Sequence, residues 1–216
     1  MNLKIWFLLF IIYSIVGWLI EVCLNLYTNK KFVNRGFLIG PWCTIYGWGA
    51  ILMTFLLSEY SGDLAVLFLM SVFICAVLEY FTSFFMEVMF NTRWWDYSNY
   101  KYNINGRICL ETMIPFGLLG CFMMYISNPI LISLLYKIPD FLLTALTVII
   151  LIIFLIDNII SFSIIFRLNI ITKDVRNDYT EEITKKVKEI LLSKNLLHKR
   201  IVHAFPNMKT KPKRKK

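Results

Sequence analysis

The stretch at residues 91–111, NTRWWDYSNYKYNINGRICLE, lies between two long apolar segments and is dense in charged and aromatic side chains. It contains Arg93, Asp96 and Arg107, two adjacent tryptophans and three tyrosines. Arginine suits binding chemistry because its planar guanidinium group holds a carboxylate or phosphate through two parallel hydrogen bonds. The stretch is therefore a candidate binding loop, with an aromatic belt at a membrane interface as the alternative role for its tryptophans.

Three glutamates lie within apolar segments, namely Glu21, Glu79 and Glu87. An ionisable side chain inside a membrane helix costs about 2.5–3.5 kcal/mol on insertion scales, so each glutamate needs a partner or a function. Ser83 is four residues from both Glu79 and Glu87, which places the three side chains on one helix face. Such a polar stripe indicates a face turned towards other protein groups or water rather than towards lipid.

The candidate site residues combine carboxylates, arginines and neutral hydrogen-bonding side chains, and two interpretations of them stay open. In the first, they line a water-filled cavity in which arginines hold an anionic group and the deeper Glu79 takes up a proton or a cation. In the second, the acids and arginines neutralise one another as structural ion pairs. The candidate substrate-binding residues are Glu21, Asn34, Arg35, Tyr46, Glu79, Ser83, Glu87, Arg93, Trp94, Trp95, Asp96, Tyr97, Asn105, Arg107 and Glu111.

A second dense stretch, NRGFLIGPWCTIYGWG at residues 34–49, contains four glycines. Glycine allows tight turns and close helix packing, and Pro41 suits the first turn of a helix. The backbone amides of residues 34–40 could cradle an anion there, with an ordinary glycine-rich helix start as the alternative. Asp157 is expected near the membrane midplane, either paired with a neighbour or part of the cavity.

These residues must be positioned by membrane helices, because 58% of the 216 residues are hydrophobic and the mean hydropathy is +0.63. A hydrocarbon core about 30 Å thick requires about 20 apolar residues per helix. The first segment is expected to be a retained helix and not a cleaved signal peptide, because Glu21 lies within it. The predicted fold is all-α and polytopic, with spans at residues 4–27, 41–58, 64–90, 107–126 and 141–166, and with 126–138 as a sixth span in the alternative count.

The distribution of positive charge predicts the orientation in the membrane. Residues 167–216 carry fifteen of the 23 lysines and arginines, so the C-terminal tail is predicted to be cytoplasmic. With five spans the N-terminus lies outside, and the loops at 28–35 and 91–107, with three positive charges each, fall on the cytoplasmic side. The candidate residues then gather at or just below the cytoplasmic surface, and the predicted cavity opens to the cytoplasm.

The predicted organisation is a transmembrane domain over residues 1–170 followed by a polar tail. Residues 171–204 alternate apolar residues at helical spacing with lysines, which indicates a basic amphipathic helix, and residues 205–216 predict a disordered basic end. Beside a membrane, the simplest partner for this tail is anionic lipid head groups, at about 1 kcal/mol per basic residue. No nucleic-acid partner is expected, and a homo-oligomer is compatible with the sequence.

Motifs for metal, cofactor or catalytic chemistry are absent from the sequence. The five cysteines are scattered singly and the only two histidines lie in the tail, so neither a metal nor a cofactor is expected. The chain has no G-x-x-x-x-G-K-[ST] loop and is therefore not itself an ATPase, and it has no H-E-x-x-H motif. The sequence favours a non-enzymatic role.

The strings NRGFLIGP, IYGWG, LEYFTS with Glu87, RWWDYS and NINGRICL resemble the bacterial membrane family described as "Putative ABC-transporter type IV". The resemblance runs from about Tyr13 to Gly120 and departs from the family at Thr44, where the family usually carries proline. It implies a transporter permease or substrate-capture subunit, which would need a separate ATPase on its cytoplasmic face. Two other functions stay open, a membrane-embedded enzyme acting on a lipid or isoprenoid substrate and a non-catalytic assembly or sensory partner.

Overall fold

The structure is a computed structural model of the chain, and it describes residues 1–90, 92–171, 200, 203–205 and 209–210. Most of the described chain is helical, which confirms the all-α class. The helices are α1 (Leu3–Asn29), α2 (Thr44–Leu57), η1 (Ser58–Tyr60), α3 (Leu64–Phe90), α4 (Leu110–Phe122), η2 (Met123–Ser127), α5 (Asn128–Tyr136) and α6 (Asp140–Ile171). Two antiparallel pairs join the short strands β1 (Thr92–Arg93) with β4 (Lys209–Thr210) and β2 (Asn103–Ile104) with β3 (Ile108–Cys109).

Local sequence explains where the long helices begin and end. The side chain of Asn2 accepts the amide of Lys4 at the start of α1, and Lys30 closes that helix in a left-handed conformation with φ of 51°. At the start of α3, the carboxylate of Asp63 accepts two amides of the first turn. These caps satisfy backbone groups that the ends of a helix leave without a partner.

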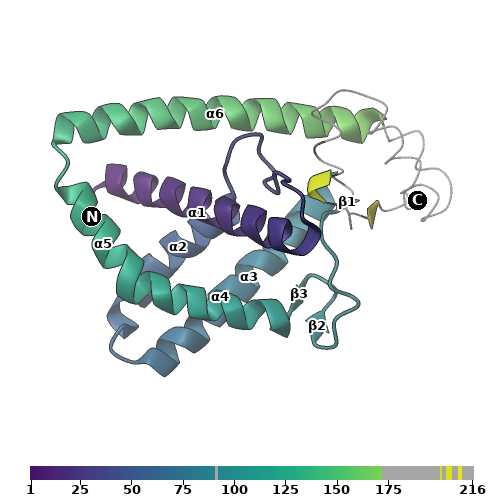
Figure 1. Cartoon of the computed structure of the whole chain (residues 1–216), viewed down its shortest axis with the longest axis horizontal. Helices are drawn as coiled ribbons and strands as arrows, with labels where there is room; N and C mark the ends of the chain where they lie inside the picture. The colour runs from purple at the N-terminus through teal and green to yellow at the C-terminus, as the bar shows by residue number, and fades with distance from the viewer. Residues whose placement is uncertain (91, 172–199, 201–202, 206–208, 211–216) are drawn as a thin grey trace.

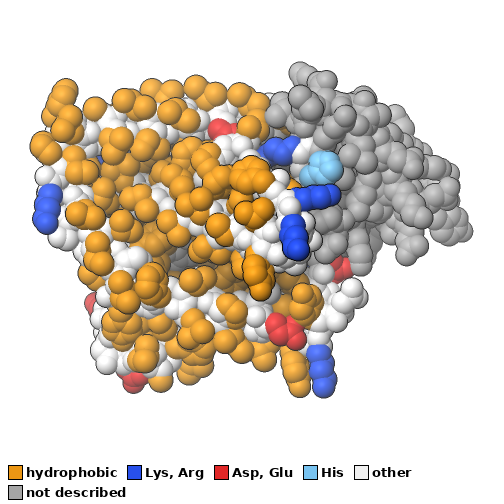
Figure 2. Space-filling view, in the orientation of Figure 1, with side chains coloured by type: hydrophobic (Ala, Val, Ile, Leu, Met, Phe, Trp, Pro, Cys, Tyr) orange, Lys and Arg blue, Asp and Glu red, His pale blue; other side chains and the backbone are white. Residues whose placement is uncertain are grey.

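Four helices are long and apolar enough to cross a membrane, namely Leu3–Asn29, Leu64–Phe90, Leu110–Tyr136 and Asp140–Ile164. The third of them is one continuous path, because the π-helical residues of η2 join α4 to α5 without a loop. The alternative count with a separate sixth span at 126–138 therefore does not hold, and the span expected at 107–126 continues to Tyr136. Hydrophobic side chains cover most of the visible helical face, as a surface against lipid requires (Figure 2).

The second span, expected at 41–58, is shorter in the structure. α2 begins at Thr44 and has 14 residues, which is about 21 Å of helix at 1.5 Å per residue. The chain before α2 is not helical: the amide of Cys43 donates to the carbonyl of Ser14 on α1 at 2.9 Å, so this amide does not take part in a helical turn of its own. Five full-length spans are thus corrected to four long helices and a short α2, preceded by a non-helical segment in which Trp42 is buried.

The helices α1, α3 and α6, the α4–α5 path and the shorter α2 run along one direction between two ends of the molecule (Figure 1). α1, α3 and α6 run towards one end, and α2 and the α4–α5 path run back. We call the first end the loop end, because residues 30–43, residues 92–109 and the end of α6 lie there. The opposite end, the turn end, holds the N-terminus and the turns at 58–63 and 137–139, and there Lys4 of α1 forms an ion pair with Asp140 of α6.

α1 and α2 approach closely because glycines lie at their contact. The ring of Tyr46 covers Gly17, where a Cβ atom would collide with it. A Cβ atom at Gly47 would collide with the hydroxyl of Ser14 and the backbone carbonyl of Phe10. Small residues allow this close backbone approach between membrane helices, and the approach carries the Tyr46 hydroxyl to the carboxylate of α1 described below.

The substitution Gly47→Ala should destabilise the protein, because the added methyl group meets α1 backbone that cannot rotate out of the way. Overpacking of this kind costs about 1–3 kcal/mol. The measurement is thermal unfolding in detergent, with Gly62→Ala as the matched control, since a Cβ atom at Gly62 meets nothing within 4 Å. Equal unfolding midpoints for the two variants would show that the α1–α2 contact is looser than the structure has it.

Candidate binding site at the loop end

Glu87, in the last turn of α3, holds two arginines at once. Its Oε2 forms an ion pair with Nη2 of Arg107 at 2.8 Å and accepts a hydrogen bond from Nε of Arg93 at 3.1 Å. The Glu87 side chain is only 4% exposed, so these ion pairs are shielded from water. A buried carboxylate with two guanidinium partners is satisfied, and removing a partner would leave an uncompensated charge. We call Glu87, Arg93 and Arg107 the clasp.

Arg107 is enclosed by α3 on its other sides as well. Its Nη1 donates to the hydroxyl of Ser83 at 3.2 Å, one turn before Glu87. The guanidinium carbon lies 5.6 Å and 5.5 Å from the ring centroids of Tyr80 and Phe84, within cation–π range. The polar stripe predicted on this helix face therefore exists, and part of it binds Arg107 of the 92–109 loop.

The loop at residues 92–109 folds on itself above the clasp. Nε1 of Trp95 donates to the carbonyl of Arg107 at 3.0 Å, and the carboxylate of Asp96 accepts the amide of Ser98. The turn between β2 and β3 contains Asn105 and Gly106 at positive φ, and a Cβ atom at Gly106 would collide with Ser98 and meet Asp96. Arg107 follows this compact turn directly and reaches α3 from it.

Glu79 lies two turns deeper on α3, and its partner is a phenol. The hydroxyl of Tyr97 donates to Oε1 of Glu79 at 3.0 Å. Glu79 is 7% exposed, its Oε2 is buried without a hydrogen-bond partner, and no salt bridge reaches it from the described residues. Burial, followed by the charge of Glu79, raises the pKa of Tyr97, so this phenol stays a neutral donor.

Glu21 on α1 repeats the arrangement of a carboxylate with a tyrosine. The hydroxyl of Tyr46 on α2 donates to Oε1 of Glu21 at 2.9 Å, while Nε of Arg35 lies 3.7 Å from Oε2. The charge of Glu21 also contributes to the raised pKa of Tyr97, so the Glu21 and Glu79 pairs lie near each other. The side chains of Glu21 and Arg35 are 27% and 32% exposed, which makes this the accessible side of the two pairs.

Two other candidate residues support the surrounding chain instead of facing the carboxylates. Asn34 accepts from Nε1 of Trp18 at 2.8 Å and donates to the carbonyl of Ile39 at 2.7 Å, which closes the turn before α2. Trp94 is buried in an aromatic cluster, with ring centroids 5.7 Å from Phe37 and 4.9 Å from Phe205. Trp94 is thus a packing residue in this structure, and Asn34 organises a turn.

The sequence predicts that backbone amides of residues 34–40 cradle an anion. Two of these amides bind a carboxylate of the chain itself. The carboxylate of Asp157 on α6 accepts the amides of Ile39 at 3.0 Å and Gly40 at 2.8 Å, and it also accepts the hydroxyl of Ser161. The expectation that Asp157 pairs with a neighbour therefore holds, with backbone amides as the partners. This contact fixes the non-helical segment before α2 against α6.

The structure thus divides the predicted residues into groups. One carboxylate group consists of Glu21, Arg35, Tyr46, Glu79 and Tyr97, and the clasp group consists of Ser83, Glu87, Arg93, Trp95, Asp96, Asn105 and Arg107. Glu111 is exposed on α4 and belongs to neither group.

The candidate residues chosen from the sequence did not include Tyr80, whose hydroxyl accepts a hydrogen bond from the Asn105 side chain at 3.0 Å. Its position next to Glu79 in the sequence was a signal for a place in the site.

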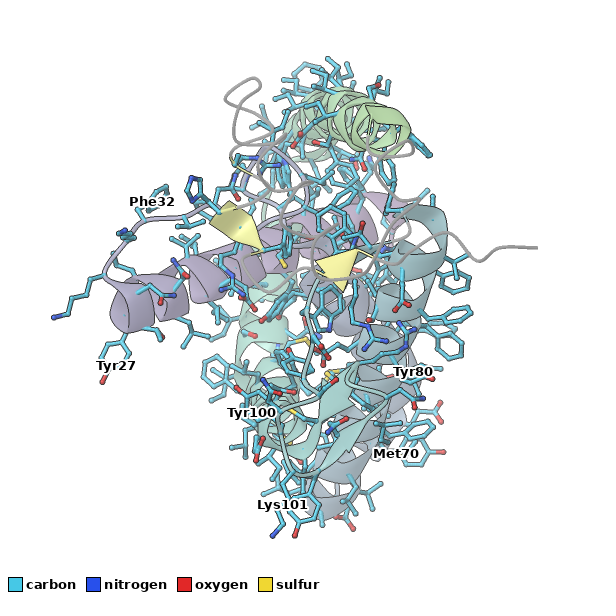
Figure 3. All side chains as sticks on the ribbon, turned by 90° about the vertical axis from the view of Figure 1, so that its right-hand side faces the viewer. Tyr27, Phe32, Met70, Tyr80, Tyr100 and Lys101 are labelled. Carbon is cyan, nitrogen blue, oxygen red and sulfur yellow. The ribbon has the colours of Figure 1, made fainter. Side chains whose placement is uncertain are left out.

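Figure 3 looks at the loop end directly. Tyr27 and Phe32 point outwards on the side of α1, Tyr80 lies on the opposite side with α3, and Tyr100 and Lys101 lie at the tip of the 92–109 loop.

A hollow of about 450 Å³ elsewhere in the molecule is apolar and lies between the turn-end half of α3 and α4. It is lined by Leu64, Ala65, Phe68, Leu118 and Cys121, none of which is a candidate residue.

The expected tail lies mostly outside the described residues, including nearly all of the predicted amphipathic helix at 171–204. The part that the structure describes contacts the loop end: β4 pairs with β1, and Ala204 is fully buried. Residues 205 and 209–210, within the stretch expected to be disordered, contribute the Phe205 ring on Trp94 and the strand β4. The described tail residues therefore join the membrane core.

Comparison with known proteins gives one family. The model of the family described as "Putative ABC-transporter type IV" matches residues 8–162, which is well over half of the chain. No curated protein and no solved structure matches the chain. The matched residues include most of α1, all of α2 to α5, most of α6 and both groups of the candidate site. The chain is a membrane protein that belongs to this ABC-transporter type IV family.

Proposed function

We propose that this protein is the membrane subunit of a transport system, a permease or substrate-capture subunit, and that Glu79 and Glu21 bind a cationic group or a proton of the solute. The observation that carries the proposal is the buried carboxylate of Glu79, whose Oε2 has no hydrogen-bond partner and which no described cation pairs. Family membership supports the transport role.

The contrast between the two acids of α3 supports this assignment. Glu87 is neutralised by two arginines and has a structural role, whereas Glu79 receives one hydrogen bond from a neutral phenol. An isolated charge in an apolar environment is costly. A buried carboxylate without a cationic partner is therefore stabilised either by taking up a proton or by binding a cation. The energetic cost is retained where the group has a function.

The second carboxylate provides a route of entry. Tyr46 fixes one oxygen of Glu21, and the other oxygen has only the long 3.7 Å contact with Arg35. Because both side chains are partly exposed, solvent screens this pair and weakens it. A cationic solute group arriving at the loop end could replace Arg35 on Glu21 and then reach Glu79.

The orientation follows from the same charges that predict it from sequence. We place the loop end in the cytoplasm and the N-terminus outside, because the basic loops and the described part of the tail gather at the loop end. The basic tail would contact anionic lipid head groups there. A separate ATPase would dock on the loop end, since the chain itself has no nucleotide-binding loop.

The test is capture of the ATPase at one end of the molecule only. A photo-crosslinker attached at Lys101→Cys, at the tip of the 92–109 loop, should trap an ATP-hydrolysing protein in membranes of the native host. The same reagent at Ser61→Cys, at the turn end, should not. Five native cysteines are replaced beforehand. Capture at Ser61 alone would reverse the orientation, and the absence of any ATPase from both captures would contradict an ABC-type transport role.

A further inference from the structure

The segment Gly36 to Leu38 turns three consecutive backbone carbonyls towards one cation. Nη1 of Arg200 donates to the carbonyls of Leu38 at 2.6 Å and Gly36 at 3.3 Å, and Nη2 donates to that of Phe37 at 3.0 Å. Arg200 comes from the C-terminal tail, more than 160 residues away in the sequence. Hydrogen bonds from an ionised donor are roughly twice as strong as neutral ones, so three carbonyls make a substantial cation site.

The next two residues of the same segment use their backbone amides, and these bind an anion instead of a cation. The amides of Ile39 and Gly40 donate to the carboxylate of Asp157, so carbonyls and amides of one turn point to opposite partners. Asp157 forms no ion pair with any described residue, and its charge favours the charged form of Arg200. The negative charge of Asp157 therefore lies next to the carbonyl segment, where it attracts a cation bound by the carbonyls.

Aromatic side chains shield this place from water in part. Phe37 lies in an aromatic group with Phe90, Trp94 and Phe162, at centroid distances of 5.7, 5.7 and 5.3 Å. Burial lowers the pKa of Arg200, and its Nε is buried without a hydrogen-bond partner. The tail arginine thus bears a desolvation cost and leaves one of its donors unused, so its fit to the site is incomplete.

We propose that the carbonyls of Gly36, Phe37 and Leu38, backed by Asp157, form a binding site for a guanidinium-type cation, and that Arg200 occupies it as a tethered ligand. The site is separate from the Glu21 and Glu79 carboxylates and does not depend on the transport role. Two donor nitrogens reach three carbonyls here, which a planar guanidinium fork can do and a point-like ammonium matches less well. A free guanidinium compound and the tail compete for it.

Chemical rescue in the full chain tests the site. Arg200→Ala should unfold at a lower temperature in detergent than the wild type, and methylguanidinium at millimolar concentration should raise its midpoint by several degrees. Tetramethylammonium at equal ionic strength should not, because it has no N–H donor. The wild type, with its site filled, should not respond, and Arg200→Ala combined with Asp157→Asn should respond much less. His203→Ala, an exposed neighbour on the tail, is the matched control and should behave like the wild type.

Several outcomes would overturn the proposal. It fails if methylguanidinium leaves Arg200→Ala unchanged, or if it shifts the wild type and His203→Ala equally. If Arg200→Ala does not fold, Arg200→Lys decides instead, because it keeps the charge and loses the fork. A midpoint for Arg200→Lys equal to that of the wild type would show that the segment binds any cation in this position and does not select guanidinium.

Discussion

Replacing Arg107 with alanine should lower the free energy of unfolding by about 3–5 kcal/mol, the range for breaking a buried ion pair from one side. The Glu87 carboxylate would keep its ion pair with Arg93 at 3.1 Å and lose the shorter ion pair with Arg107 at 2.8 Å. Ser83 would lose its donor, and two aromatic rings of α3 would lose the cation beside them. The effect is large because the guanidinium of Arg107 joins the 92–109 loop to the end of α3.

Unfolding in detergent, followed by heat or by denaturant, measures this loss. Lys101→Ala in the same loop is the control, because that lysine is exposed and forms no ion pair with any described residue. Arg107→Lys should fall between the two, since an ammonium group can hold Glu87 but cannot reach Ser83 with a second arm. A loss below about 1 kcal/mol for Arg107→Ala, the size of a surface pair, would mean that water already solvates the clasp.

Replacing Glu79 with glutamine should have the opposite profile, with the fold retained and the function lost. Glutamine has nearly the same shape and still accepts the Tyr97 hydrogen bond, but it carries no charge. If Glu79 binds a cationic solute group, solute-stimulated ATP hydrolysis should fall about 30-fold or more, which corresponds to about 2 kcal/mol of lost charge pairing. The unfolding midpoint should stay the same or rise, because the charge without a partner is gone.

The assay uses the ATPase complex reconstituted in vesicles, with sodium, potassium, ammonium and spermidine as cation probes and an imposed pH gradient as the proton probe. Glu111→Gln is the matched control, because Glu111 is exposed on α4 and belongs to neither group of the site. Full stimulation of Glu79→Gln would remove Glu79 from the mechanism. A wild-type complex that responds to none of the probes would contradict the assignment of a cationic or proton-coupled solute.

Sequence reasoning predicted the membrane class and three of the spans well, because helix length and hydropathy are local properties. It also predicted that costly polar residues gather at one end. It did not predict the length of α2, because Pro41 allowed a helix start that the Cys43 contact with Ser14 prevents. That contact is between segments far apart in the sequence, and no local pattern contains it.

The same limit explains the division of the candidate site. From sequence, Glu79 and Glu87 share one face of one helix and look equivalent. Which of them receives arginines depends on the path of the 92–109 loop, which places Arg93 and Arg107 at Glu87 and the Tyr97 phenol at Glu79. Arg200 was beyond prediction for the same reason, since the tail contains many similar basic residues.

The central claim is that Glu79, and not Glu87, is the functional carboxylate of α3. Reaction with a hydrophobic carbodiimide tests it most directly, because this reagent enters the membrane and modifies carboxyl groups that can take up a proton, while an ion-paired carboxylate is protected. The intact protein in native membranes is treated, and peptides containing each glutamate are quantified by mass spectrometry. We expect modification of Glu79, protection of Glu87 by its two arginines, and release of that protection in Arg107→Ala. Modification of Glu87 in preference to Glu79 in the wild type would contradict the account.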